Sequence, residues 1–315
     1  MLADKYVQYS FLSAYSICWR MSSAQHAARI VKSLENSDWK VLKALESSMK
    51  KGEFTPITYL ASESGLNAEE VEFRLKRLQD SELVRHDPKG FAMVWAGYDA
   101  LALKGFVDRN LIAGMGMQIG VGKESDVLEA IGDKGEKFAV KFYRIGRISF
   151  RDTRRKRAYL ASSQHQWLLV NSGAAKREFE SLQKLYPLGV AVPHAIARER
   201  HAILMDKVEG TILANLIKIP RAGSVLRKVL SNVSKAYREG LINSDLSEFN
   251  ILYDGANIWL IDWPQAVEVS HKNAENLLKR DVYNVVNFFK RRHNIKCDAE
   301  NALAYIKGIS KLVIA

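Results

Sequence analysis

Residues 241–263, LINSDLSEFNILYDGANIWLIDW, contain the pattern on which the fold assignment depends. Asp245 is followed five residues later by Asn250, and Asp262 ends an apolar run that begins at Ile258. The run predicts a short buried strand that ends in a carboxylate. Phosphoryl transfer from a nucleotide needs a carboxylate beside the entering oxygen, and an amide oxygen and a second carboxylate on Mg²⁺. The stretch has these groups in that order, although a turn followed by an edge strand is an alternative interpretation.

A glycine-rich segment precedes this stretch and ends in Gly120-Val121-Gly122-Lys123. It is not a Walker A loop, because Glu124 stands where that loop needs Ser or Thr. It is not a Rossmann turn either, because residues 127–130 predict a strand instead of a helix. A glycine loop between two strands is typical of the lid of protein kinases, where backbone N–H groups cover the nucleotide phosphates. Ser125 replaces the third glycine of that lid, and its hydroxyl is expected to bond a phosphate. A bare hairpin is the alternative.

The next expected strand, residues 138–142 (FAVKF), carries Lys141 within an apolar run. Burial of an ammonium group is costly unless it has a partner. In protein kinases this lysine binds the α- and β-phosphates and pairs with a glutamate of the following helix. Glu178 and Glu180 both lie in the expected helix, and Glu178 is preferred because apolar residues then occupy the adjacent face.

Residues 201–210, HAILMDKVEG, predict an inner strand that runs into the linker between two lobes. Met205 lies at the end of its apolar part. The carbonyl of Asp206 and the amide of Val208 are expected to bind adenine. The motifs of the chain thus follow the order found in protein kinases: glycine lid, lysine, glutamate, linker, Asp/Asn pair and final Asp.

The residues before the glycine loop predict a winged helix domain. Ser37 or Asp38 is expected to cap a first helix, Thr55-Pro56 to begin a second, and Asn67 to cap a third. Turn residues at 85–90 then predict a hairpin, and helices followed by a hairpin are typical of this domain. The polar residues on the third helix are expected to contact a nucleic-acid backbone or to dock a protein. They are Glu72, Arg74, Lys76 and Arg77.

The segments GVGKESDV, GRISFR, VPHAIARERHAILMD, SDLSEFNIL and IDWPQAV together resemble the RIO family of atypical protein kinases. The preceding winged helix resembles the subfamily that carries this domain at its N-terminus. The resemblance implies that Asp245 is the catalytic carboxylate and that Asn250 and Asp262 hold Mg²⁺ or Mn²⁺. It also implies that Asp262 is catalytic in forming an acyl-phosphate, within an ATPase switch. The ATP-binding residues predicted from the motifs and the resemblance are Gly120, Val121, Gly122, Lys123, Ser125, Val127, Lys141, Glu178, Met205, Asp206 and Val208.

The sequence departs from the family pattern in the catalytic loop. The family usually has His-Gly before the catalytic Asp, whereas this chain has Asn243-Ser244. Serine adopts the φ values open to glycine less readily, so a remodelled loop with lower turnover is one expectation. Trp263 replaces the usual Phe and keeps an aromatic ring. No Ala-Pro-Glu sequence follows Asp262, which favours an ATP-driven switch over a broad signalling kinase.

The charge of the chain favours an acidic partner. Its 315 residues include 47 Lys+Arg against 35 Asp+Glu, a formal net charge of +12. Residues 144–157 hold seven basic residues, expected in a loop over the nucleotide cleft that contacts rRNA phosphates; a solvated basic loop is the alternative. The resemblance implies binding to the precursor of the small ribosomal subunit. Candidate rRNA-binding residues are Arg147, Arg151, Arg154, Arg155 and Arg157.

Cysteine usage and hydropathy favour a cytoplasmic protein. Cys18 and Cys297 lack metal-ligand spacing, and two cysteines so far apart do not suggest a disulfide framework. The sequence shows neither a signal-peptide pattern nor a run near the about 20 apolar residues of a membrane span. A monomer with no membrane partner is expected.

The expected fold is α+β, with a winged helix domain followed by a minimal bilobal kinase-like domain. The expected boundaries are 1–33 for an extension of unclear role, 34–112 for the winged helix, 113–210 for the N-lobe and hinge, and 211–315 for a truncated C-lobe. The expected function is that of a Mg-ATP-dependent serine/threonine protein kinase or ATPase, a switch in maturation of the small ribosomal subunit. One rival is a nucleic-acid-binding winged helix protein with a weakly active or inactive kinase fold. The other is a small-molecule phosphotransferase, whose cationic substrate would need an acidic pocket.

Overall fold

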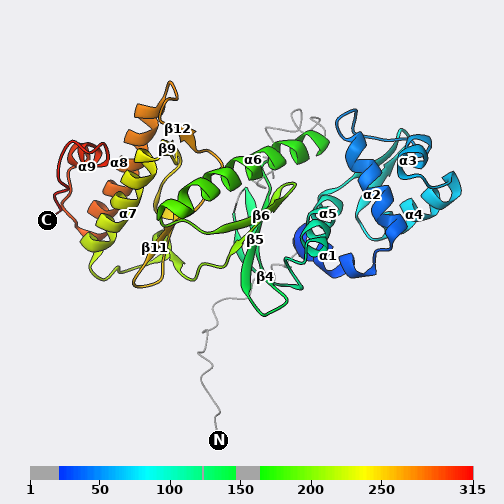
Figure 1. Ribbon diagram of the computed structural model, residues 1–315, viewed down its shortest axis with the longest axis horizontal. Coiled ribbons are helices and arrows are strands. Elements are labelled where there is room, and N and C mark those ends of the chain that lie inside the picture. Colours follow the sequence, from blue (N-terminus) through cyan, green and yellow to red (C-terminus); the bar gives the residue numbers. More distant parts are fainter. Residues whose placement is uncertain (1–20, 123, 147–163, 315) are drawn as a thin grey trace, which may run out of the picture.

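The computed structural model describes residues 21–122, 124–146 and 164–314. The winged helix domain, an N-terminal lobe built on a sheet and a helical C-terminal lobe follow one another along the long axis (Figure 1). The expected α+β fold, a winged helix domain followed by a bilobal kinase-like domain, is confirmed. The five candidate rRNA-binding arginines and Lys123 lie outside the described residues.

Helices and a hairpin make up the winged helix domain, with α5 leading into the next domain. The elements are α1 (Ser23–Ile30), η1 (Val31–Ser33), α2 (Asn36–Ser48), α3 (Ile57–Ser64), α4 (Ala68–Asp80), β1 (Val84–Asp87), β2 (Gly90–Met93) and α5 (Trp95–Asp108). As predicted, Asn67 caps α4, since its Oδ1 accepts from the backbone N–H of Glu70 at 2.8 Å. Gly65 ends α3 with φ +68°, a left-handed conformation that glycine adopts without steric cost.

The predicted cap of α2 is wrong. The helix begins at Asn36 with Glu35 as its N-cap, and Asp38 lies within the first turn. The carboxylate of Asp38 accepts from the backbone N–H of Glu35 at 2.8 Å. The Glu35 side chain in turn accepts from the N–H of Asp38, so two end donors are satisfied reciprocally and the helix starts earlier than Ser37.

Helix α1 belongs to the core of the winged helix domain. Ala24 and Ala27 are fully buried in the same hydrophobic cluster as residues of α5. Ser22 caps α1 in a capping box with Gln25. Part of the region before residue 34 is therefore helical and packed against the domain that follows it.

The N-terminal lobe is an antiparallel sheet with the strand order β3-β4-β5-β7-β6. Helix α6 lies beside it (Figure 1). Alternate residues of β5 and β7 serve two cores: Val140 and Leu204 join the winged helix cluster, whereas Ala139 and Met205 join the C-lobe cluster. The elements are β3 (Gly114–Val121), β4 (Ser125–Ile131), β5 (Lys137–Tyr143), α6 (Gln164–Leu185), η3 (Tyr186–Leu188), β6 (Ala195–Glu199) and β7 (Ala202–Asp206).

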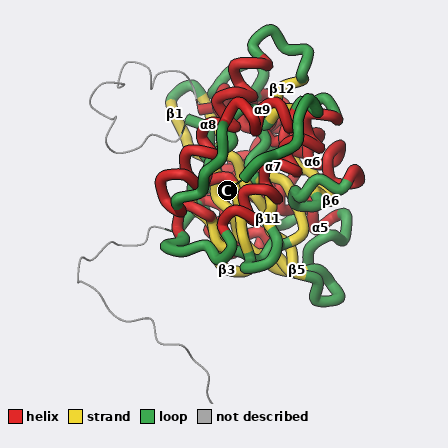
Figure 2. Tube along the Cα trace, turned by 90° about the vertical axis from the view of Figure 1, so that its left-hand side faces the viewer, coloured by secondary structure: helices red, strands yellow, loops and turns green. Residues whose placement is uncertain are grey.

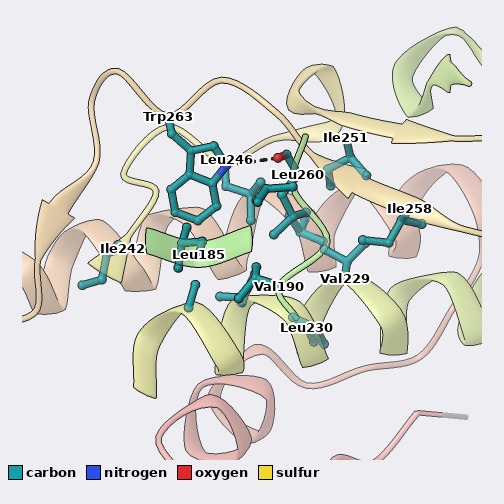
Figure 3. Packing of buried hydrophobic residues seen from close by; sticks show 14 of the residues in the cluster. Leu185, Val190, Val229, Leu230, Ile242, Leu246, Ile251, Ile258, Leu260 and Trp263 are labelled. Atoms are coloured by element: carbon teal, nitrogen blue, oxygen red, sulfur yellow. Dashed lines mark hydrogen bonds between the residues drawn. The ribbon is translucent and has the colours of Figure 1, made fainter. Parts of the chain in front are cut away.

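The C-terminal lobe packs helices around short strands and forms the outer end of the molecule (Figure 2). Trp263 is 1% exposed, and its indole N–H donates to the carbonyl of Leu260 at 3.0 Å (Figure 3). This residue fixes the chain directly after Asp262 in the core. The elements are β8 (Thr211–Ile212), η4 (Leu213–Asn215), α7 (Ala222–Arg238), β9 (Leu241–Ile242), η5 (Glu248–Asn250), β10 (Ile251–Tyr253), β11 (Ile258–Leu260), β12 (Val267–Glu268), α8 (Ala274–His293) and α9 (Ala299–Ile306).

None of the helices in the described ranges combines the length and the apolar character that a membrane crossing requires.

Candidate active site

Lys141 lies at the centre of the site, between the two lobes. Its Nζ is 2.7 Å from Oε2 of Glu178 on α6 and 2.9 Å from Oδ1 of Asp262. Of the two candidate glutamates, Glu178 is the one that contacts Lys141, whereas Glu180 is exposed and pairs with Lys176. Burial opposes the charge on Lys141, yet the carboxylates of Asp262 and Glu178 raise its pKa. The ammonium therefore stays charged at neutral pH, as phosphate binding requires.

Glu178 also fixes the position of the Asp262 segment. Its Oε1 accepts from the backbone N–H of Trp263 at 3.2 Å. Asp262 itself has φ +68°, which turns the chain sharply at the end of β11. The helix carrying Glu178 thus holds both the lysine and the backbone beside the candidate metal ligand.

The catalytic loop is organised by Asn243. Its Nδ2 donates to the carbonyl of Asp262 at 3.0 Å, and its Oδ1 accepts from the backbone N–H of Asp245 at 3.1 Å. Asp245 is exposed to solvent. Partial burial, followed by the negative charge of Asp262, raises the pKa of Asp245. A raised pKa improves a carboxylate as a proton acceptor.

Ser244 adopts the glycine-like conformation that the sequence made doubtful. Its φ is +61°, and its backbone N–H donates to Oδ2 of Asp281 on α8 at 2.7 Å. Its hydroxyl donates to the carbonyl of Gln265. The expected remodelling of this loop is therefore absent at Ser244, because neighbouring groups hold the serine in the left-handed region.

Asp281 belongs to the site, although no sequence motif identifies it. It is 2% exposed and accepts from the backbone N–H groups of Ser244 and Leu246, which flank Asp245. Burial raises the pKa of Asp281 to about 7, while the two backbone donors oppose that rise. Its only sequence signal is an acidic residue among the apolar positions of α8, which by itself does not identify a partner.

Asn250 and Asp262 fit a Mg²⁺ site that is completed by phosphate. The Asn250 side chain donates from Nδ2 to the carbonyl of Asp245 at 2.9 Å, which leaves Oδ1 as an acceptor. Its backbone carbonyl accepts from the N–H of Ile261 at 2.9 Å, so Asn250 is held beside Asp262. Within the described ranges, no group of three or more His, Cys, Asp or Glu side chains is placed to hold a metal. Mg²⁺ commonly takes one or two protein oxygens together with substrate phosphates, which suits this pair.

The glycine loop joins β3 and β4 as expected. The backbone N–H of Gly122 donates to the carbonyl of Ser125 at 2.8 Å, which closes the turn. A Cβ at Gly122 would lie 3.4 Å from the Ser125 hydroxyl oxygen, and one at Gly120 would lie 3.5 Å from Val127. Of the predicted loop residues, Gly120, Gly122, Ser125 and Val127 thus lie together, in a strand pair that ends beside Lys141 of β5.

The hinge follows β7. Met205 is 7% exposed and pairs in register with Ala139 of β5, on the face shared with the C-lobe. Among the described residues, the amide of Val208 donates to no backbone carbonyl, so it is available for a ligand. The side chain of Asp206 contacts Nδ1 of His194 at 3.1 Å. Binding of adenine by the Asp206 carbonyl and the Val208 amide stays a prediction.

One expectation about basic residues needs revision. The sequence places Arg144 in a loop over the cleft, but this residue is 2% exposed and pairs with Asp99 and Asp126. Arg74 and Arg77 of α4 both pair with Glu35 of the same domain, and contact of α4 with a nucleic-acid backbone stays a prediction. The reason is the same in each case, because carboxylates distant in sequence are brought next to these guanidinium groups by packing.

The fold and the site together define a protein-kinase-like phosphotransferase preceded by a winged helix domain. Family models agree: the RIO domain matches residues 126–302, and the model described as Rio2, N-terminal matches residues 31–109. The chain therefore belongs to the RIO kinase family, and its N-terminal domain is of the Rio2 type. The rival assignment to the small-molecule phosphotransferases is wrong.

Known relatives and a solved structure are similar to this chain over most of its length. The RIO-type serine/threonine-protein kinase Rio2 of Methanocaldococcus jannaschii is 38% identical over 82% of this chain and 99% of its own length. The serine/threonine-protein kinase rio2 of Dictyostelium discoideum is 34% identical over 84% of this chain, which spans about half (52%) of that relative. The crystal structure of the Rio2 kinase–ADP/Mg²⁺–phosphoaspartate complex from Chaetomium thermophilum is 32% identical, with a TM-score of 0.77 over 85% of this chain and 84% of that one.

Proposed function

We propose that the chain is a Mg-ATP-dependent switch that acts in maturation of the small ribosomal subunit. The observation that carries the enzymatic part is the position of Lys141, which contacts both Glu178 and Asp262. This arrangement supports the proposal, because it suits a lysine that binds phosphate next to a carboxylate that holds Mg²⁺. The Rio2 kinase of Chaetomium thermophilum, whose crystal structure is a complex with ADP, Mg²⁺ and phosphoaspartate, supports the same chemistry.

We assign the following roles to the residues of the site. Lys141 and the backbone of the glycine loop bind the phosphates, and the hinge binds adenine. Asn250 and Asp262 hold Mg²⁺, which neutralises charge on the phosphate oxygens when bound. Asp245 orients the entering oxygen and accepts its proton, which suits a carboxylate whose pKa is raised.

Formation of an aspartyl phosphate is the transfer step that we favour. A carboxylate oxygen of Asp262 forms a bond to the γ-phosphorus of ATP as the bond from that phosphorus to the β–γ bridging oxygen breaks, and ADP leaves with this oxygen. Water then attacks the phosphorus, Asp245 accepts a proton from that water, and the bond between the phosphorus and the Asp262 oxygen breaks, which releases inorganic phosphate and the free carboxylate. Autophosphorylation on a hydroxyl is the alternative outcome, and it differs in the stability of the labelled product toward base and hydroxylamine.

The decisive experiment compares Mg²⁺-dependent ATP hydrolysis by the wild type, Asp245→Ala and Asp262→Asn, with trapping of phosphoprotein in acid. Loss of turnover in both variants, and loss of an acid-stable, hydroxylamine-sensitive label in Asp262→Asn, is expected. Asp133→Asn is the matched control, because Asp133 is exposed in the turn between β4 and β5. Tight ATP binding without turnover by the wild type would instead favour a nucleotide-gated binding protein with an inactive kinase fold.

The ribosomal part of the proposal rests on charge and on the family. A formal net charge of +12 favours a partner rich in phosphate. Co-sedimentation with purified small-subunit precursor particles tests it, at a series of salt concentrations. Replacement of Arg147, Arg151, Arg154, Arg155 and Arg157 by Gln is expected to weaken binding and to reduce its salt dependence. Unchanged binding by that variant would remove these residues from the rRNA interface.

A further inference from the structure

A buried ionic cluster joins the winged helix domain to the nucleotide-binding lobe. The guanidinium of Arg144, which follows β5, makes two parallel bonds to the carboxylate of Asp99 on α5, at 2.9 and 2.8 Å. Its Nε donates to Oδ2 of Asp126 on β4 at 3.1 Å. All three side chains are at most 2% exposed. Nε2 of His201 lies 2.7 Å from Oδ1 of Asp99 and completes the cluster.

The cluster ends at the glycine loop. The backbone N–H of Arg144 donates to the carbonyl of Glu124 at 2.6 Å. Asp126 directly follows Ser125 and pairs in register with Val121, the last residue of β3. Side chain and backbone of Arg144 therefore contact the loop from both sides of Ser125, the residue expected to bond a phosphate.

The same junction reaches α6. Ile145, the next residue, donates its backbone N–H to Oδ1 of Asn171 at 2.7 Å, and its carbonyl accepts from Nδ2 of Asn171 at 3.0 Å. Asn171 is fully buried and lies on the helix that carries Glu178. A displacement of Arg144 would thus be transmitted to the glycine loop and to the helix that holds Lys141.

We infer that Asp99 of the winged helix domain is a positioning residue for phosphate binding, acting through Arg144 on the glycine loop. The physical reason is that a buried guanidinium paired with two carboxylates cannot shift without leaving charge uncompensated. Helix α5 and the glycine loop consequently move as one unit. The winged helix domain is then part of the nucleotide site as well as a docking module. This inference rests on the proposed binding of Mg-ATP.

A second ion pair at the same interface provides a matched control. Arg200, in the turn between β6 and β7, makes two bonds to the carboxylate of Glu46 on α2, at 2.6 and 2.8 Å. The turn lies at the β6 side of the sheet, whereas the glycine loop lies at the β3 side. Glu46→Gln therefore weakens the contact between the two domains without touching the phosphate-binding loop.

The test compares the affinities of Mg-ATP and adenosine by titration calorimetry in the wild type, Asp99→Asn, Arg144→Lys and Glu46→Gln, with thermal melting of each. Adenosine contacts the hinge but has no phosphate, so a misplaced glycine loop weakens ATP binding selectively. Asp99→Asn is expected to weaken ATP binding about tenfold and to leave adenosine binding unchanged. Arg144→Lys retains the buried charge but lacks the planar fork that reaches both carboxylates, and it should shift ATP affinity in the same direction.

Glu46→Gln should lower the melting temperature while the ratio of ATP to adenosine affinity stays at the wild-type value. The inference is overturned if Asp99→Asn and Arg144→Lys also keep that ratio, or if Glu46→Gln changes it as much as they do. A wild-type chain that binds no Mg-ATP would contradict the proposed function itself, and the inference with it.

Discussion

Asn243 donates from Nδ2 to the backbone carbonyl of Asp262, 3.0 Å away, and so connects the catalytic loop to the segment with the candidate metal ligand. The same side chain accepts from the backbone N–H of Asp245 at 3.1 Å. One amide group therefore links the segments that carry the two carboxylates to which we assign the proposed transfer. The residue that departs from the family pattern in sequence supplies both a donor and an acceptor in the structure.

Replacement of Asn243 by Ala should lower the rate constant of ATP hydrolysis with little change in KM for ATP. A displacement of about 1 Å between reacting groups is able to cost about 10²-fold in rate, and loss of this link permits such a displacement. Asn243→Asp is the companion variant, because it keeps the acceptor for Asp245 and loses the donor to Asp262. Steady-state kinetics on both variants give the comparison, and wild-type turnover in Asn243→Ala would show that the link is dispensable.

Ser244 allows the strain of its left-handed backbone to be measured. Ser244→Ala removes the hydroxyl bond to Gln265 and retains a Cβ at φ +61°, so it should destabilise the fold. Ser244→Gly loses the same bond but relieves a conformational cost of about 1 kcal/mol. Urea unfolding should therefore rank Gly above Ala in stability by about that amount. An alanine variant as stable as the glycine variant would mean that the position is unstrained.

Asp281 predicts a specific pH dependence of stability. Its pKa in the folded protein is raised to about 7, above the ordinary value of about 3.9. The folded state therefore binds more protons than the unfolded state between these values. The resulting stabilisation is complete below the pKa that Asp281 has in the unfolded chain. It is lost as the pH rises from that value through the folded-state pKa of about 7. The free energy of unfolding of the wild type should fall with rising pH in this window.

The matched variant is Asp281→Asn, which does not titrate. It should lack this component of the slope, although it leaves one of the two backbone donors, Ser244 or Leu246, without its acceptor. Urea unfolding between about pH 5 and about pH 8 measures both slopes. Parallel curves for the two proteins would refute the assignment.

Gly97 of α5 packs closely against Leu83 and against Met93 of β2. A Cβ at this position would lie 2.3 Å from the carbonyl oxygen of Leu83 and 3.0 Å from the Met93 side chain. Gly97→Ala should therefore cost about 1–3 kcal/mol in the free energy of unfolding, as for other overpacked sites. Gly52→Ala is the control, because no atom lies within 4 Å of the added Cβ. Equal stability of the two variants would contradict this close packing.

The local chemistry of the site was predictable from the sequence. The order of Lys141, Glu178, Asp245, Asn250 and Asp262 follows from motifs whose residues are close neighbours along the chain or lie on elements with clear periodicity. The choice of Glu178 over Glu180 was possible within a single helix. Two residues that lie two positions apart face different sides of a helix, so the helical period indicates which glutamate faces the packed side.

Tertiary structure decided the partners of the charged groups. Nothing near Arg144 in sequence indicates Asp99, which is 45 residues away, and nothing near Ser244 indicates Asp281, which is 37 residues away. The same pattern of residues is compatible with an exposed basic loop and with a buried ion pair. Only packing of α5 and α8 removes water from these groups, and it is the loss of water that makes a particular carboxylate an obligatory partner.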